Sequence, residues 1–150
     1  MDPLFELDQQ LVQDCFIMGD FPLCRLLLLN DTNYPWFILV PRIAGMEELH
    51  DLTGEQQQQF MQESSGLARA LKEHFAGEKM NVAALGNAVR QLHVHHIVRY
   101  SSDKAWPGPV WGRFPAQPYG QNEVNEVMVR LVPLLGESFQ PLNDKGRHYG

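Results

Sequence analysis

The sequence predicts an α+β domain: an antiparallel sheet of about five strands with one long helix and a C-terminal helix packed on it. Two patterns indicate this class, namely apolar stretches of strand length joined by short turns and one long amphipathic stretch. A length of 150 residues, with 44% hydrophobic and 20% charged residues, is typical of one globular domain. We expect a single domain over residues 1–137 and a flexible tail over residues 138–150.

The N-terminal half predicts a short helix followed by three strands. Residues 6–14 have the apolar spacing of an amphipathic helix, and residues 15–18 form the first strand. Residues 24–29 are nearly all apolar, which predicts a strand buried on both faces. Residues 36–40 form a third strand that ends at Pro41. The short connections favour antiparallel pairing.

A long helix follows, with clear start and stop signals. Thr53 and Gln56 have the spacing of a capping box, and Gly77 is a natural stop. One helical face carries the apolar residues, namely Phe60, Leu67, Leu71 and Phe75. These positions predict that this face packs on the sheet.

The C-terminal half predicts two further strands and a last helix. We expect strands over residues 79–85 and 91–100. Residues 105–120 hold four prolines and two tryptophans, which predicts a stiff, irregular loop. Residues 124–135 have helical apolar spacing and form the C-terminal helix.

Charge and composition narrow the classes of function. A net charge of −6 argues against general affinity for nucleic acid, which needs a basic surface. No stretch has the pattern of a signal peptide or the length of a membrane span, so we expect no membrane association. Cys15 and Cys24 form no Cys-x-x-Cys motif, and we expect free thiols in a reducing cytoplasm.

The most informative residues lie in the predicted strand over residues 91–100. Three of the six histidines fall within residues 93–96. Because side chains alternate along a strand, Gln91, His93 and His95 would share one face and His96 the other. Accidental enrichment and a zinc site are the alternatives. Alternation weakens the zinc site, since His96 points away from the other two histidines.

Residues 86–95 resemble the signature of the histidine triad (HIT) superfamily, Gly-Gln-x-Val-x-His-φ-His-φ-His, where φ is apolar. In this register Gln91 takes the place of the first histidine, and His93 and His95 are the second and third. Residues 26–30 and 35–41 resemble the paired strands of the family. Residues 105–112 resemble a bacterial branch often labelled as diadenosine polyphosphate hydrolases.

The resemblance implies a HIT-like fold and a nucleotidyl hydrolase or transferase that acts on nucleoside 5′-phosphate derivatives, usually as a homodimer. It implies that His93 attacks the α-phosphorus of a dinucleoside polyphosphate or phosphoramidate and forms a nucleotidyl-histidine intermediate. We expect a backbone carbonyl to hold the second nitrogen of His93. His95 could bind phosphoryl oxygens or protonate the leaving group. No cofactor and no resident metal are expected, although a divalent cation could accompany the substrate.

Nucleotide contacts are expected from the turn before the histidines and from three more distant residues. Gly86 permits a close approach of the backbone, and the turn amides could bind an oxyanion. The turn amides are those of Asn87, Ala88 and Val89. Asn30 could bind ribose or form a turn, and Asn81 could contact the nucleotide or end a strand. Arg99 could pair with phosphate or with a carboxylate.

Two departures from the family pattern leave a second hypothesis open. Gln91 can form hydrogen bonds but cannot carry a proton at neutral pH, and Trp36 stands where many members have a fourth histidine. The alternative is therefore a non-catalytic nucleotide-binding HIT protein with a degraded triad. Substitution of His93 separates the two hypotheses, because only an enzyme would lose turnover.

Overall fold

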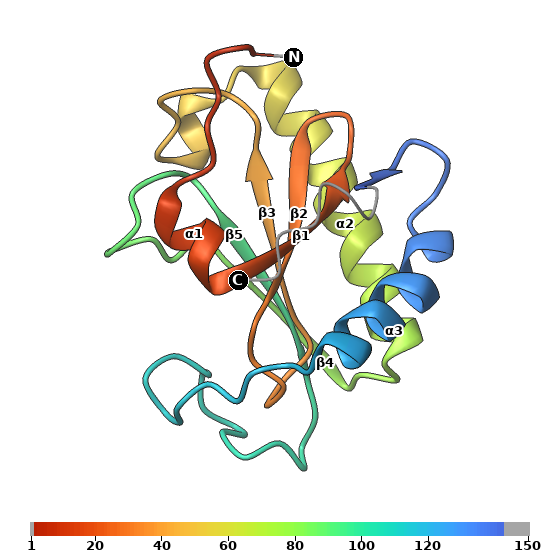
Figure 1. Cartoon of the computed structure of the whole chain (residues 1–150). Coiled ribbons are helices and arrows are strands. Elements are labelled where there is room, and N and C mark those ends of the chain that lie inside the picture. The colour runs from red at the N-terminus through yellow and green to blue at the C-terminus, as the bar shows by residue number, and fades with distance from the viewer. Residues whose placement is uncertain (1, 143–150) are drawn as a thin grey trace.

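In the part of the chain that the structure describes, six strands form one antiparallel sheet in the order β4-β5-β3-β2-β1-β6 (Figure 1). The computed structural model describes residues 2–142. The strands are β1 (Cys15–Asp20), β2 (Cys24–Leu29), β3 (Trp36–Pro41), β4 (Lys79–Ala83), β5 (Val94–Arg99) and β6 (Gln140–Pro141). The helices are α1 (Gln9–Asp14), α2 (Gly54–His74) and α3 (Gln121–Leu131), with short 3-10 turns at Leu49–Asp51 and Val132–Leu134. The predicted α+β class is confirmed.

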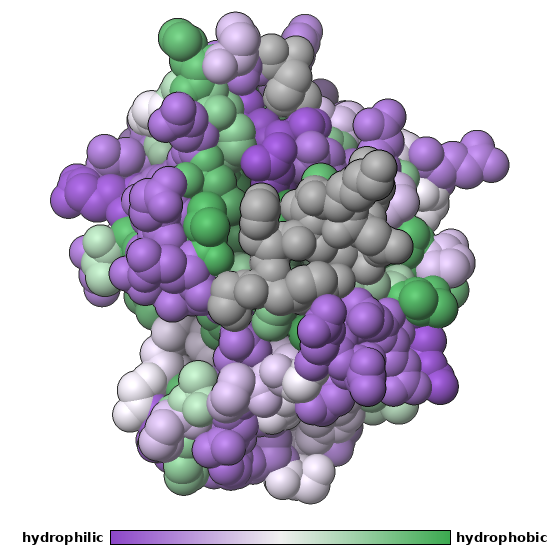
Figure 2. Space-filling model, in the orientation of Figure 1, coloured by the Kyte–Doolittle hydropathy of each residue, from purple (hydrophilic) through white to green (hydrophobic). Residues whose placement is uncertain are grey.

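Hydrophobic clusters lie on both faces of the sheet. Helices α2 and α3 cover one face, where Leu67, Met128 and Phe37 belong to one buried cluster (Figure 1). On the other face a second cluster joins Trp36 of β3 to Leu11 of α1 and to the loop that follows β5. Burial on both sides explains why residues 24–29 and 36–41 are almost entirely apolar. Figure 2 shows a largely hydrophilic surface with scattered apolar side chains.

Helix α2 begins and ends as the sequence predicts. The side chains of Thr53 and Gln56 form the capping box with the backbone. The helix ends at His74, and the Gly77 amide donates to the Lys72 carbonyl. A Cβ atom at Gly77 would lie 2.4 Å from Val98 Cγ1, so only glycine allows this close approach to β5. Within residues 2–142 no helix is both long enough and apolar enough to cross a membrane.

The strand that carries the histidines is shorter than predicted. It begins at Val94 rather than at residue 91, because the last pairings of β5 with its neighbours are Leu39 with Val94 and Ala83 with His95. The preceding strand ends at Ala83 rather than at residue 85. Residues 91–93 therefore pair with neither neighbouring strand, although β3 continues to Pro41, and they belong to the loop between β4 and β5.

The predicted flexible tail over residues 138–150 is wrong for residues 138–142. Phe139 is buried and packs on Phe21 with ring centroids 4.8 Å apart. Strand β6 then pairs with Gly19 and Asp20, which adds a sixth strand to the sheet. A Cβ atom at Gly19 would lie 2.4 Å from the Gln140 carbonyl oxygen, so glycine makes this pairing possible. Residues 143–150 lie outside the described residues.

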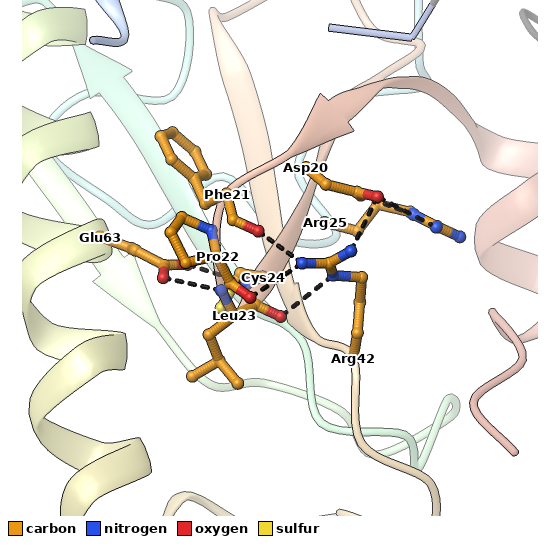
Figure 3. Close-up of polar contacts among 8 residues, drawn as sticks. All are labelled: Asp20, Phe21, Pro22, Leu23, Cys24, Arg25, Arg42 and Glu63. Carbon is orange, nitrogen blue, oxygen red and sulfur yellow. Dashed lines mark hydrogen bonds and ion pairs between the residues drawn. The ribbon is translucent and has the colours of Figure 1, made fainter. Parts of the chain in front are cut away.

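The turn between β1 and β2 is held by two side chains from distant parts of the chain (Figure 3). The buried Glu63 carboxylate of α2 accepts hydrogen bonds from the amides of Leu23 and Cys24, at 2.9 and 2.8 Å. The Arg42 guanidinium donates to three carbonyls of the same turn and pairs with Asp20. Both the donors and the acceptors of this turn are thus satisfied by protein groups.

Substitution of Glu63 by glutamine should lower the free energy of unfolding. Glu63→Gln turns an NH2 group toward one of the two backbone amides, which leaves a buried donor without an acceptor and costs about 1–3 kcal/mol. Urea denaturation followed by circular dichroism measures this loss. Gln62→Ala, which changes the exposed residue before Glu63 in the same helix, is the control. Its free energy of unfolding should stay within about 0.5 kcal/mol of wild type. Equal stability of both variants would contradict the proposed support of the turn.

Candidate active site

His93 immediately precedes β5 and is held by its own backbone. Its Nδ1 atom lies 2.7 Å from the Gln91 carbonyl oxygen. A carbonyl oxygen only accepts, so Nδ1 carries the proton and Nε2 has a free lone pair. Within residues 2–142, Nε2 has no hydrogen-bond partner. The backbone carbonyl expected to hold this imidazole is therefore present, and it belongs to Gln91.

The loop between β4 and β5 packs directly on the His93 ring. A Cβ atom at Gly86 would lie 3.2 Å from His93 Cε1 and 2.6 Å from the Val89 carbonyl oxygen. Any side chain at residue 86 would therefore push the loop away from the imidazole. The His93 ring is thus the group that the Gly86 backbone approaches closely, and the expected contact of Gly86 with a nucleotide stays a prediction.

A pocket of about 260 Å³ lies beside His93. Asn87 and Gly86 line it, as predicted for the turn before the histidines. In the part of the chain that the structure describes, the amides of residues 87–89 donate no hydrogen bond. Such free amides can bind an anion beside the imidazole. Val89 packs partly against the second cluster.

Glu47 and Arg90 also line this pocket and were not predicted as site residues. Their side chains form an ion pair of 3.0 Å and are largely exposed. Arg90 occupies a variable position of the signature, and Glu47 comes from a loop 43 residues earlier in the chain. No local pattern in the sequence could have joined the two.

His95 is the second imidazole of the site, and Trp36 contacts it. The ring centroids of His93 and His95 are 5.0 Å apart. Trp36 Nε1 donates to His95 Nδ1 at 2.9 Å, and His95 Nε2 lies 3.2 Å from the Leu85 carbonyl oxygen. Burial, followed by the charge that His93 carries when protonated, lowers the pKa of His95 to about 4. His95 is therefore neutral at physiological pH.

Gln91 belongs to the site through its backbone rather than its side chain. Its Oε1 accepts from the Asp8 amide at 2.9 Å, and its Nε2 donates to the Glu6 carbonyl at 2.8 Å. The amide thus ties the segment before α1 to the histidine loop. The sequence predicted a catalytic side chain at this position, whereas the structure uses the carbonyl to orient His93.

Arg99 and Asn81 do not lie in the pocket beside His93. The Arg99 guanidinium is 1% exposed and pairs with Asp103 at 2.8 Å. It also donates to Asn81 Oδ1 at 2.7 Å and to the Gly108 carbonyl at 2.8 Å. Of the two interpretations of Arg99, the carboxylate partner is correct. The nucleotide-binding role expected of both residues is not supported, because each uses its polar atoms to anchor the loop after β5.

Asn30 does not line the pocket beside His93. Its Oδ1 accepts from the Tyr119 amide at 2.8 Å, which fixes the chain that leads into α3. It lines a different pocket, of about 430 Å³, together with Asp14 and Leu29. The structure therefore gives Asn30 a structural contact, and the expected ribose contact stays a prediction.

His96 faces away from the other two histidines, as the strand alternation predicts. It is fully buried beneath α2, and its Nε2 lies 2.7 Å from Ser64 Oγ. This geometry gives no support to the alternative of a zinc site. Within residues 2–142 no group of three or more His, Cys, Asp or Glu side chains is placed to hold a metal ion.

Comparisons with known proteins agree with this geometry. The HIT domain family matches residues 10–102. A histidine triad protein from Marinobacter aquaeolei VT8 is 52% identical, with a TM-score of 0.86, over 87% of this chain and 96% of that chain. A histidine triad protein from Bradyrhizobium japonicum is 43% identical, with a TM-score of 0.87, over 89% of this chain and 100% of that chain.

A third solved structure, a histidine triad protein from Sinorhizobium meliloti 1021, is 42% identical, with a TM-score of 0.85, over 87% of this chain and 96% of that chain. Comparison with curated proteins gave no significant match. The family match spans more than half of the chain and includes the histidine strand. This chain therefore belongs to the HIT domain family.

Proposed function

We propose that this protein is a nucleotidyl hydrolase or transferase that acts on the α-phosphate of nucleoside 5′-phosphate derivatives. The observation that carries the proposal is the state of His93, whose Nδ1 donates to the Gln91 carbonyl at 2.7 Å. This contact leaves the lone pair of Nε2 available for attack, and His93 lines a pocket together with Asn87, whose amide donates no hydrogen bond within residues 2–142. Dinucleoside polyphosphates and nucleoside phosphoramidates both offer the phosphorus that this nitrogen would attack.

The reaction has two displacement steps. First, His93 Nε2 attacks the α-phosphorus, a P–N bond forms, and the bond to the leaving group breaks with its electron pair. The Gln91 carbonyl stabilises the positive imidazole of the intermediate, because it accepts from Nδ1. Water or another acceptor then attacks phosphorus and loses a proton to solvent. The P–N electrons return to Nε2, and the nucleoside monophosphate leaves.

The surrounding groups can stabilise the negative charge on phosphorus-bound oxygens. Of the three turn residues, Asn87 lines the pocket, and its amide, which donates no hydrogen bond within residues 2–142, is a donor available there. His95 Nε2 can donate a hydrogen bond to a phosphoryl oxygen when it releases the Leu85 carbonyl. We propose no cofactor, and any divalent cation would enter with the phosphates of the substrate.

Substitution of His93 by alanine should abolish turnover. His93→Ala removes the nucleophile, so release of nucleoside monophosphate should fall by about 10³-fold or more. The substrates are diadenosine tetraphosphate, adenosine 5′-phosphoramidate and a nucleotidyl sugar, with AMP or the other monophosphate measured by chromatography. His50→Ala is the control, because this histidine has an exposed side chain and does not line the pocket.

A second measurement separates catalysis from binding. Wild-type enzyme quenched during turnover should carry one added nucleotidyl group on the peptide that contains His93, detected by mass spectrometry. Wild-type protein that binds AMP but releases none from any substrate would refute the hydrolase. That outcome would support the non-catalytic nucleotide-binding alternative.

Substitution of Gln91 by alanine should leave most of the activity. The Gln91→Ala variant keeps the carbonyl that orients His93 and loses only the two bonds to residues 6 and 8. We expect activity within about tenfold of wild type and faster amide hydrogen exchange at Asp8. Gln10→Ala, which removes an exposed glutamine of α1, is the control. A loss as large as that of His93→Ala would show that the Gln91 amide takes part in the chemistry.

We also propose a homodimer in the cytoplasm. Strand β4 is at one edge of the sheet, and Val82 on it is 49% exposed. An edge strand with an apolar side chain can pair with a second copy. Cys15 and Cys24 are free and buried, which suits a reducing compartment.

Light scattering should give the mass of two chains for wild type, because pairing of two β4 edges would cover Val82. Val82→Lys places a charge in that contact and should shift the mass to that of one chain. Val129→Lys, the same substitution at an exposed valine of α3, is the control. A wild-type mass of one chain would contradict the dimer.

A further inference from the structure

We propose that Trp36 is a positioning residue that holds His95 as a neutral imidazole with its proton on Nε2, so that the site favours phosphate leaving groups over amines. The state of the imidazole is a property of the folded protein, whereas the preference for a leaving group rests on the proposed function.

The hydrogen bonds of His95 permit one tautomer. The indole of Trp36 has a donor and no acceptor, so His95 Nδ1, at 2.9 Å from Trp36 Nε1, must be unprotonated. The Leu85 carbonyl has only acceptor atoms, so Nε2, at 3.2 Å from it, must carry the proton. The two partners come from different elements, and both select the same neutral form.

The indole cannot easily turn away from His95. Trp36 lies on β3 beside β5, where it pairs with Ile97, two residues beyond His95. It is 6% exposed and is packed edge to face between Tyr34 and Trp111, with ring centroids 6.3 and 5.8 Å away. A donor that is fixed in this way keeps Nδ1 occupied whether or not substrate is present.

The groups around His95 oppose a second proton. Burial is the main cause that lowers the pKa of His95 to about 4, and the positive charges that His93 and His96 carry when protonated contribute to the same shift. The other groups that contact the ring are uncharged, namely Trp36 from β3, Trp111 from the loop after β5 and the Leu85 carbonyl. A proton on Nδ1 would also place two N–H groups opposite each other. His95 can thus donate a hydrogen bond but has no imidazolium proton to transfer.

This state of His95 discriminates between leaving groups. When His93 displaces a phosphate, the P–O bond breaks and the oxygen keeps the electron pair as a stable anion, which a hydrogen bond from His95 Nε2 can stabilise. When His93 displaces an amine, the departing nitrogen needs a proton as the P–N bond breaks. Neutral His95 could supply that proton only by becoming an imidazolate. Phosphoric anhydrides are therefore the favoured class.

Arg90 provides a charge that fits a phosphate leaving group. It lines the pocket beside His93, and its guanidinium is exposed and paired with Glu47 at 3.0 Å. An exposed ion pair of this kind is weak, so a phosphate can replace the carboxylate at little cost. Guanidinium groups bind phosphate in a bidentate manner.

Nitrogen-15 NMR of the histidine rings tests the tautomer directly. In wild type, between about pH 5 and 8, His95 should stay neutral with an unprotonated Nδ1. Its signals are assigned by their loss in His95→Asn. In Trp36→Phe, which removes the donor and keeps an aromatic ring, the proton affinity of His95 should rise about tenfold or more.

Trp111→Phe is the matched control. Trp111 also packs edge to face on His95, at 5.3 Å between centroids, but no hydrogen bond joins the two within the described residues. This variant should keep the wild-type tautomer. A wild-type His95 with its proton on Nδ1, or one that titrates near pH 6.5 like a free imidazole, would overturn the proposal. An equal rise in the proton affinity of His95 in Trp36→Phe and Trp111→Phe would assign the effect to burial and overturn the role of Trp36.

Steady-state kinetics with two substrates test the preference for phosphate over amine leaving groups. At pH 6, wild-type kcat/KM for diadenosine tetraphosphate should exceed that for adenosine 5′-phosphoramidate by about tenfold or more, and Trp36→Phe should narrow this ratio. A wild-type enzyme that prefers the phosphoramidate would overturn the inferred substrate class. The NMR result stands apart from turnover, so failure of the proposed function is distinguishable from failure of this inference.

Discussion

The hydrogen bond from His93 Nδ1 to the Gln91 carbonyl is the contact on which the proposed chemistry depends. It selects the tautomer whose free nitrogen can attack phosphorus, and it holds that tautomer without a charged partner. The carbonyl can accept from the His93 ring because residues 91–93 lie in the loop before β5 and not in the sheet. They lie outside the sheet because β4 ends at Ala83 and the pairing of β3 with β5 ends at Leu39. The ends of these two pairings thus place the proposed nucleophile.

This arrangement explains how the family position of the first histidine can be occupied by Gln91. Under the proposed function, the group needed at that position is the backbone carbonyl, which every residue type supplies. The side chain is then free for another task, and here the amide bonds to residues 6 and 8. Those bonds hold the segment before α1 beside the loop between β4 and β5. The substitution is therefore compatible with an intact nucleophile.

Local patterns in the sequence predicted what depends on local geometry. Strand alternation correctly separated His95 from His96, and the capping box at Thr53 correctly began α2. Alternation could not identify the partners of a side chain, so phosphate and a carboxylate were both open as partners of Arg99, and the structure shows Asp103 of the following turn. Strand β6 gave no signal, because two residues carry no periodicity and its anchor is the single side chain of Phe139. The pairing of Trp36 with His95 depends on how neighbouring rings orient the indole, which no local pattern records.

His96 shows why tautomer alone does not make a nucleophile. Its Nδ1 lies 3.0 Å from the carbonyl of Val94, two residues earlier, just as His93 uses the carbonyl of Gln91. Both imidazoles therefore carry the proton on Nδ1 and have a lone pair on Nε2. In His96 that lone pair accepts from Ser64 Oγ beneath α2, whereas in His93 it has no partner in the described residues and lies beside a pocket. The same local bond is thus present in His96, a core residue on the covered face of the sheet, and in His93, just before the start of the strand. Helix α2 makes the difference, because it supplies a partner for Nε2 of His96.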